Sequence, residues 1–214
     1  MIAIHTMMQL LAKKRPIFHS EADFQHSLAW GIHESDPSIE IRLEYPHDIE
    51  NSRWHLDLWL MRGDERCAVE LKYYTTTLQT LLDGESYQLR DHSADDHLRH
   101  GFCKDVERLE TVNQSTNNCT SYAILLTNSP RLWLPPKSER MTNDSAFLLH
   151  DGRNFGGALE WGPNASAGTR KGHEAVIQLN GSYDLMWRDY SSLEGTKNGE
   201  FRYLVTQISQ ELYK

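Results

Sequence analysis

The chain has no long apolar run, which excludes one class of protein at once. None of its 214 residues fall in a stretch near the ~18 apolar residues of a membrane-spanning helix. The first eleven residues are apolar in patches, but Lys13, Lys14 and Arg15 follow them, which reverses the order of a secretory signal. We therefore expect a cytoplasmic protein with no membrane partner.

Cysteine is also scarce. The three cysteines, Cys67, Cys103 and Cys119, are far apart and show no C-x-x-C spacing. Such scattered positions indicate neither a zinc site nor a disulfide framework.

Positive charge is in deficit, with 22 Lys and Arg against 30 Asp and Glu, a formal net charge of −8. This balance argues against a protein that coats nucleic acid with a broad basic face. It does not exclude a nuclease, because acidic residues gathered in a cleft lower the total. Phosphate contacts would then come from a local patch or from a homodimer. The length and the 39% hydrophobic content suit one globular domain over residues 1–214.

Two strand-like segments, residues 54–62 and 65–74, stand on either side of a glycine-containing turn. Apolar residues occupy every second position in both, which is the pattern of strands with one buried face. The alternating residues are Leu56, Leu58 and Leu60 in the first segment and Cys67, Val69 and Leu71 in the second. We expect all six on one apolar face of a hairpin.

The turn sets the register of this hairpin. If residues 63–64 form a two-residue loop of the II′ type, Asp57 lies opposite Glu70 and His55 opposite Lys72, provided that no bulge intervenes. Directly opposed Cβ atoms are about 4.5–5.5 Å apart, so two carboxylates there repel each other unless a cation lies between them. The face is therefore either solvated or a site for an oxygen-seeking ion such as Mg²⁺.

The pattern of Asp57 followed by Glu70-Leu71-Lys72 resembles the PD-(D/E)XK nuclease superfamily, which has the restriction-endonuclease-like fold. Its signature is an Asp on one strand and Glu-X-Lys on the next. The Pro that often precedes the Asp is replaced by Leu56. The family usually carries an acidic residue on a preceding helix, and Glu21 is placed for that role. The resemblance covers roughly residues 18–128.

The resemblance implies a metal-dependent phosphodiesterase, endonuclease-like, acting on DNA. Asp57, Glu70 and the Leu71 carbonyl would hold Mg²⁺, with Mn²⁺ as a substitute, and Glu21 would complete the shell or bind a second ion. The metal would lower the pKa of a bound water and neutralise charge on the phosphate. Lys72 would orient that water or stabilise the developing oxyanion.

Two other interpretations stay open. The charged positions could form the solvated outer face of an ordinary hairpin. The nuclease-like fold could also serve as a catalytically inactive module that binds nucleic acid or protein, which the acidic balance and the unassigned second half favour. Metal titration would distinguish a live site from either of these.

The remaining elements up to residue 128 follow the order of the restriction-endonuclease-like core. Ser20 and Asp23 form a capping-box-like start for a helix, on which Glu21 could reach the site or complement the helix dipole. We then expect a strand near 39–44, a polar loop over 46–53, the hairpin, a helix over 95–112 and a buried strand over 122–128. The expected fold is α/β, as helix, three-strand meander, helix and strand.

A long polar connection over residues 75–96 separates the hairpin from the second helix. Leu78, Leu81 and Leu82 suggest a short helix within it. Long connections near a site are often functional, so this one could be a lid or a substrate loop. Gln88 could correspond to a helical Gln of some nuclease families, or be a solvated loop residue. On the second helix, Asp105 and Arg108 are three residues apart and can pair on one face.

Residues 129–214 look like a β-rich extension of the first sheet. Asn180-Gly181 is a type I′ hairpin signal. Short strands are expected at 147–149, 158–161, 175–179, 183–187 and 201–205. The tryptophans in this half, Trp133, Trp161 and Trp187, are expected to pack in the core, the alternative being that one stacks on a base.

One glycine-flanked turn, residues 168–172, carries two cations. Arg170 and Lys171 lie between glycines that allow a close backbone approach. We expect this turn to contact nucleic-acid phosphate and not bases, the alternative being a plain solvated turn.

Overall fold

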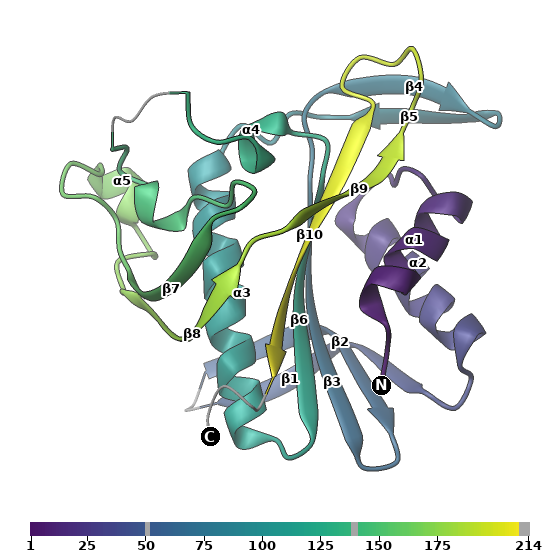
Figure 1. Cartoon of the computed structure of the whole chain (residues 1–214), viewed down its shortest axis with the longest axis horizontal. Helices are drawn as coiled ribbons and strands as arrows, with labels where there is room; N and C mark the ends of the chain where they lie inside the picture. The colour runs from purple at the N-terminus through teal and green to yellow at the C-terminus, as the bar shows by residue number, and fades with distance from the viewer. Residues whose placement is uncertain (50–51, 138–140, 210–214) are drawn as a thin grey trace.

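The protein is a mixed α/β structure built on one six-stranded sheet (Figure 1). The structure, a computed structural model, describes residues 1–49, 52–137 and 141–209. The helices are α1 (Ile4–Lys14), α2 (Glu21–Ser35), α3 (Asp95–Ser115), α4 (Pro130–Trp133) and α5 (Ala167–Arg170), with a 3₁₀ turn η1 (Ser145–Phe147). The strands are β1 (Glu40–Ile49), β2 (Ser52–Arg62), β3 (Glu65–Tyr74), β4 (Leu78–Leu82), β5 (Glu85–Leu89), β6 (Cys119–Thr127), β7 (Asn154–Leu159), β8 (Ile177–Asp184), β9 (Trp187–Ser192) and β10 (Glu200–Ser209).

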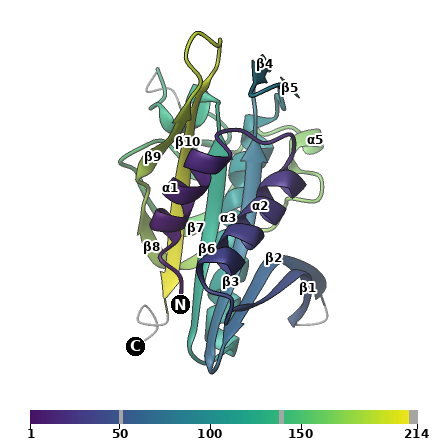
Figure 2. The same ribbon diagram turned by 90° about the vertical axis from the view of Figure 1, so that its right-hand side faces the viewer.

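The main sheet runs in the order β1-β2-β3-β6-β10-β9, and only β3 and β6 are parallel neighbours. Helices α1 and α2 cover one face, whereas α3 and the two-stranded β7–β8 sheet cover the other (Figures 1 and 2). The expected second half thus joins the first, because β9 and β10 extend the sheet beyond β6. Among the described residues, no helix is long and apolar enough to cross a membrane.

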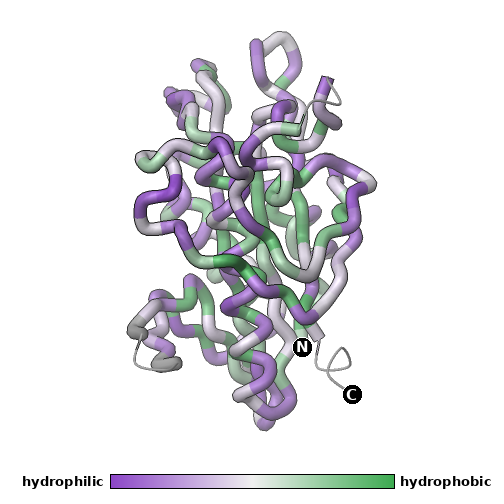
Figure 3. Tube along the Cα trace, turned by 90° about the vertical axis from the view of Figure 1, so that its left-hand side faces the viewer, coloured by the Kyte–Doolittle hydropathy of each residue, from purple (hydrophilic) through white to green (hydrophobic). Residues whose placement is uncertain are grey.

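Two apolar cores lie on the two sides of the sheet. The first joins α1 and α2 to residues of β3 such as Val69, and the second joins α3 to β7, β8 and residues such as Leu125 of β6. The hydropathy trace shows the central strands as the most apolar part of the chain, with polar segments around them (Figure 3). Strands covered on both faces need continuous apolar sequence, which explains the run expected at 122–128.

The β2–β3 hairpin is confirmed. Gly63 has φ of 55° and Asp64 has no positive φ, as a II′ turn requires, and Leu58 pairs with Val69 in the expected register. The polar loop expected over 46–53 is wrong, because β1 continues through Pro46 and pairs with β2. Proline is tolerated there because β1 is the edge strand of the sheet.

The pairing of β2 with β3 ends at Leu58 and Val69, so the ladder opens into a fork beyond that point. Asp57 and Glu70 are therefore not a ladder pair, and neither are His55 and Lys72, contrary to expectation. The β1–β2 ladder is also irregular beside Asp57, where Glu44 has φ of 50°. Leu56 packs in the second core while Leu58 packs in the first, so Leu56 does not share the apolar face that was expected for it.

The connection over 75–96 contains a β-hairpin, not the expected helix. Strands β4 and β5 pair in register around Asp83 and Gly84, both of which have positive φ. A type I′ turn requires that backbone, and an Asp-Gly pair supplies it readily. Gln88 lies exposed on strand β5, which does not fit a helical Gln and agrees with the alternative of a solvated residue, although on a strand and not in a loop.

The turn expected at Asn180-Gly181 is wrong because both residues lie inside β8. Glu110, buried on α3, accepts hydrogen bonds from the Asn180 and Gly181 backbone N–H groups at 2.8 Å and from the Tyr183 hydroxyl at 2.7 Å. This carboxylate satisfies the backbone of an extended segment, so the local turn preference of Asn-Gly does not prevail.

Two further strand expectations in the second half need correction. Residues 147–149 end a 3₁₀ turn and continue without strand structure, and residues 183–187 are divided between the end of β8 and the start of β9. Strand β7 ends at Leu159 and so covers only the first half of the expected 158–161 strand, and β10 contains the expected 201–205 strand. Trp133, Trp161 and Trp187 are buried, as expected for core residues.

Candidate functional site

The fork between β2 and β3 brings Asp57 against the backbone of the neighbouring strand. The Leu71 N–H donates to Asp57 Oδ2 at 2.5 Å, a bond that the missing ladder pair leaves available. Burial raises the pKa of Asp57 to about 6; the Leu71 hydrogen bond opposes this shift, and the charge of Glu21 adds to it. A carboxyl with this pKa exchanges its proton near neutral pH, a property that functional sites often use.

Glu70 lies close enough to Asp57 for each carboxyl to shift the pKa of the other. Glu70 is only 6% exposed, and its Oε1 has no hydrogen-bond partner among the residues that the structure describes. Burial first, and then the charges of Asp105 and Asp57, raise its pKa to about 10. The expected proximity of the two carboxyls is therefore present, although it arises from side chains meeting across a fork and not from ladder pairing.

The Lys72 side chain extends from β3 to α3, where its ammonium group contacts the Asp105 carboxylate. Its Nζ lies 2.7 Å from Asp105 Oδ2, and Asp105 is 6% exposed. Burial alone would lower the pKa of Lys72, but Asp105 outweighs it and raises that pKa. Gly101 leaves room for the crossing, since a Cβ there would lie 3.4 Å from Lys72 Cε.

Asp105 is the residue of the site that sequence reasoning placed incorrectly. It does contact Arg108, at 3.4 Å, but the pair is not a surface salt bridge because the carboxylate is buried and its shorter contact is Lys72. Burial raises the pKa of Asp105, and the charge of Lys72 opposes that shift. The missed signal is its position: Asp105 lies next to Val106 on the apolar stripe that predicted the helix.

Glu21 reaches the opposite end of the site from the first turn of α2. Its Oε2 accepts a hydrogen bond from the Tyr73 N–H at 2.8 Å, one residue beyond Lys72. Gln25, one turn later and buried, donates to the Asp57 carbonyl at 2.9 Å and to Glu44 Oε1 at 2.8 Å. Two side chains of α2 therefore hold the two strands of the fork, and Gln25 is a site residue that sequence reasoning missed.

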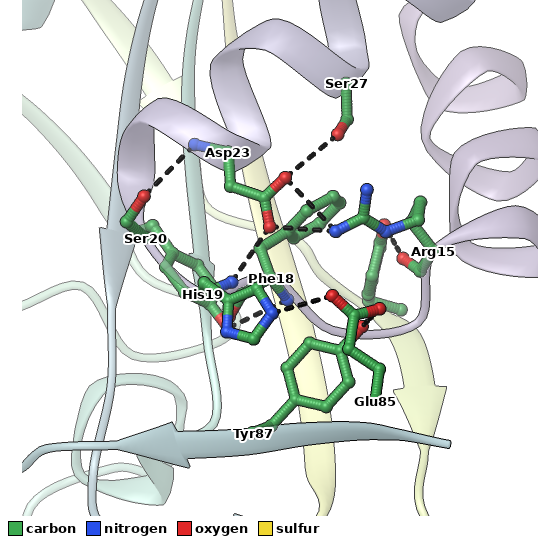
Figure 4. Close-up of polar contacts among 10 residues, drawn as sticks. Arg15, Phe18, His19, Ser20, Asp23, Ser27, Glu85 and Tyr87 are labelled. Carbon is green, nitrogen blue, oxygen red and sulfur yellow. Dashed lines mark hydrogen bonds and ion pairs between the residues drawn. The ribbon is translucent and has the colours of Figure 1, made fainter. Parts of the chain in front are cut away.

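A polar cluster fixes the start of α2 and with it Glu21 (Figure 4). Ser20 caps the helix by accepting from the Asp23 N–H, as expected, while Arg15 forms an ion pair with Asp23 at 2.8 Å. His19 contacts Glu85 Oε1 at 2.8 Å and stacks on Tyr87, with ring centroids 4.4 Å apart. These contacts of His19 hold the β4–β5 hairpin against the start of α2, which positions Glu21.

The donor chemistry of the fork suits a hard divalent cation, which prefers carboxylate and carbonyl oxygens. Asp57 and Glu70 lie next to each other, and the buried Glu70 Oε1 accepts no hydrogen bond from the described part of the chain. The arrangement is not a closed cage: over residues 1–49, 52–137 and 141–209, no group of three or more His, Cys, Asp or Glu side chains is placed to hold a metal ion.

The predicted phosphate-binding turn belongs to another part of the molecule. Arg170 ends α5, and its guanidinium donates to the Gly162 and Pro163 carbonyls at 2.7 and 3.0 Å. These hydrogen bonds join Arg170 to the loop that precedes α5, and Lys171 is the C-cap of that helix. The role of these two residues toward nucleic acid stays a prediction.

Comparisons of the chain with protein-family models, with curated proteins and with solved structures found no match.

Proposed function

We propose that the protein is a metal-dependent phosphodiesterase acting on DNA, with a site of the PD-(D/E)XK type. One observation carries the proposal: two carboxyls, Asp57 and Glu70, meet at an open fork of the sheet, and Glu70 keeps an unpartnered buried oxygen. An orphan oxygen of this kind in a native structure calls for a missing partner, and a cation is the partner that two adjoining carboxyls favour.

Asp57 and Glu70 would hold Mg²⁺ or Mn²⁺, with the Leu71 carbonyl and Glu21 as further predicted ligands. The ion, when bound, supplies an acidified water and neutralises charge on the phosphate. The chain's own residues keep the site in order: the Leu71 N–H orients Asp57, and Asp105 keeps Lys72 protonated. A protonated Lys72 is a donor for negative charge that builds on the phosphate. Strand order around the fork, with α2 before β1 and α3 before β6, agrees with the restriction-endonuclease-like core that the motif implies.

The test is a cleavage panel of plasmid, linear duplex, single-stranded DNA and RNA with Mn²⁺ or Mg²⁺. We expect wild-type protein to cut at least one DNA substrate and Asp57→Asn to lose activity by at least about 100-fold, since removal of one catalytic electrostatic partner costs that much. The Asn side chain can still accept from the Leu71 N–H, so the contact between the two strands at the fork is kept.

A matched control is Asp64→Asn, which neutralises an exposed carboxyl in the turn of the same hairpin. We expect it to cut like wild type. Undiminished cutting by Asp57→Asn, or equal loss in the Asp64→Asn control, would contradict the proposed site.

A second candidate function is a nuclease-like binding module without catalysis. The observation that favours it is that the Lys72 ammonium pairs with Asp105 and not with Asp57 or Glu70. Calorimetric titration with Mn²⁺ separates the two. Binding that Glu70→Gln abolishes supports the enzyme, and no binding by wild type supports the module.

A further inference from the structure

A row of aromatic rings lies on the β1–β2 arm next to the fork. Tyr45 stacks on Trp59, with centroids 5.5 Å apart and planes at 13°, and His47 contacts Trp54 at 5.7 Å. Trp59 is buried, whereas Tyr45, His47 and Trp54 are each partly exposed. The arm leans out of the plane of the main sheet (Figure 2), so this row flanks the sheet at the strand that also carries Asp57.

Arg108 connects this row to the candidate site. Its guanidinium lies over the Trp54 ring, 5.2 Å from the centroid, and its Nη1 lies 3.4 Å from Asp105, the partner of Lys72. The Arg108 side chain is 42% exposed and its contact with Asp105 is long. It is therefore a cation at the edge of the site that is available to an incoming anion.

These features suit unpaired nucleotides better than a duplex. Ring faces bind bases only when the bases are unstacked and turned outward, as in a single strand. A duplex presents its phosphates and groove edges, and is held by many cations spread over a broad face. This chain carries a net charge of −8, and on this arm the partly exposed Arg108 lies beside three partly exposed rings, a combination that suits base stacking better than a broad phosphate contact.

We propose that the β1–β2 arm and Arg108 form a binding track for single-stranded nucleic acid, with bases on Tyr45 and Trp54 and a phosphate on Arg108. The inference rests on the proposed function, because it takes Asp57 and Glu70 as the place where the bound strand is cut. It assigns the substrate class that the carboxyl motif leaves open.

The track is tested by fluorescence anisotropy on the full chain in EDTA, with labelled 12-nucleotide oligo(dT), oligo(U) and a 12-base-pair duplex. We expect both single strands to bind more tightly than the duplex. Trp54→Leu, which keeps apolar bulk but removes the ring face, should weaken single-strand binding about 10-fold. Trp30→Leu is the control, because Trp30 is 65% exposed on α2 and belongs to the other layer.

The phosphate contact has its own measurement. Arg108→Gln should flatten the slope of log K against log salt for oligo(dT) by about 0.7, the value for one lost phosphate contact on a single strand. Lys14→Gln, which removes an exposed cation from α1, should leave the slope unchanged. Melting curves of the four variants check that each is folded, and a variant that melts far below wild type is replaced by Trp54→Phe or Arg108→Lys, which should retain most of the binding.

The failures of the two proposals are distinguishable. If wild type binds single strands in EDTA but cuts nothing with Mg²⁺ or Mn²⁺, the result supports the binding track and contradicts the proposed phosphodiesterase activity. If wild type cuts DNA while Trp54→Leu and Arg108→Gln bind oligo(dT) like wild type, or while the duplex binds more tightly than either strand, the enzyme stands and the track is overturned.

Discussion

The Glu70 side chain combines burial, a neighbouring carboxyl and an oxygen without a partner. A folded-state pKa of about 10 lies far above the ordinary value near 4.5, so the folded protein holds a proton that the unfolded chain releases. The protonated Glu70 carboxyl therefore stabilises the folded protein at acid pH. This stabilisation is lost progressively as the pH rises from about 4.5 to about 10. Without a cation, the fork therefore opposes folding at neutral and alkaline pH.

Glu70→Gln should melt higher than wild type in EDTA at pH 8, by about 5 °C for a gain of about 2 kcal/mol in a chain of this size. The neutral amide removes the need to hold a proton. The difference should shrink towards pH 4.5, where the unfolded wild-type chain also binds the proton. Thermal denaturation in buffers of pH 4.5 to 8 measures this.

Added Mn²⁺ supplies the internal control for that comparison. We expect it to raise the melting temperature of wild type and to leave Glu70→Gln unchanged, because the variant lacks one ligand. A lower melting temperature for Glu70→Gln in EDTA would show that the two carboxyls do not repel as described.

His100 is a second buried titratable residue, and the proposed function does not use it. It is 4% exposed, neither ring nitrogen has a hydrogen-bond partner, and its ring stacks on Trp161. Burial, followed by the charges of His173, Lys104 and His97, lowers its pKa to about 4, while Glu107 opposes the shift. The His100 imidazole therefore stays neutral in the folded protein near neutral pH.

The sign of the pH effect is opposite to that of Glu70. The unfolded chain binds a proton at His100 near pH 6.5, whereas the folded protein binds it only near pH 4. The free energy of unfolding therefore falls as the pH drops from about 6.5 to about 4. Between pH 8 and pH 5 the group should cost about 2 kcal/mol. Urea denaturation should show a smaller loss for His100→Phe than for wild type, with His26→Gln, an exposed histidine variant, behaving like wild type. Equal losses in all three proteins would exclude His100 as the cause.

At the scale of elements, two carboxylates of α3, Glu107 and Glu110, bind the backbone of β8, and Glu110 makes more of these hydrogen bonds. Glu110 accepts from two backbone N–H groups, the Asn180 amide and the Tyr183 hydroxyl. Glu110→Ala leaves these donors buried or poorly satisfied, and each orphan group costs about 1–3 kcal/mol. We expect a loss of about 3 kcal/mol or more in urea denaturation, against less than about 0.5 kcal/mol for Gln114→Ala on the exposed face of the same helix. A small loss in Glu110→Ala would mean that packing and the Glu107 bond to the Gln178 N–H are enough to hold β8.

The elements that could be predicted from sequence are those whose local signals agree with their tertiary surroundings. The β2–β3 hairpin and α3 follow from apolar periodicity and, at Gly63, from turn chemistry. The prediction of a turn at Asn180-Gly181 was wrong because Glu110, distant in the sequence, accepts hydrogen bonds from the backbone N–H groups of both residues. Sequence periodicity carries no information about such a long-range partner.

The candidate site shows the same division. Asp57, Glu70 and Lys72 could be singled out because their spacing across a short hairpin is a local property. Asp105 and Gln25 could not, because their roles depend on how helices pack over the fork. The fork, and the positive φ of Glu44 beside it, are departures from regular pairing that a periodic pattern does not predict.

At the scale of the whole molecule, β10 lies between β6 and β9 and is indispensable to the sheet. A chain truncated after Pro130 would keep the motif residues but expose the apolar face of α3 and one edge of β6. We expect this truncated chain to aggregate or to lack a cooperative melting transition by circular dichroism. Cooperative unfolding of residues 1–130 would show that the first half folds alone.

The position of β10 in the sheet also sets an order of events during synthesis. β6 ends at Thr127 and β10 begins at Glu200, 73 positions later. At the usual 5–20 residues per second, the ribosome needs about 4 to 15 s to cover that interval. For that time the emerging chain carries an apolar strand with one edge still unpaired, which is the kind of surface that chaperones bind and that nascent chains on neighbouring ribosomes can capture.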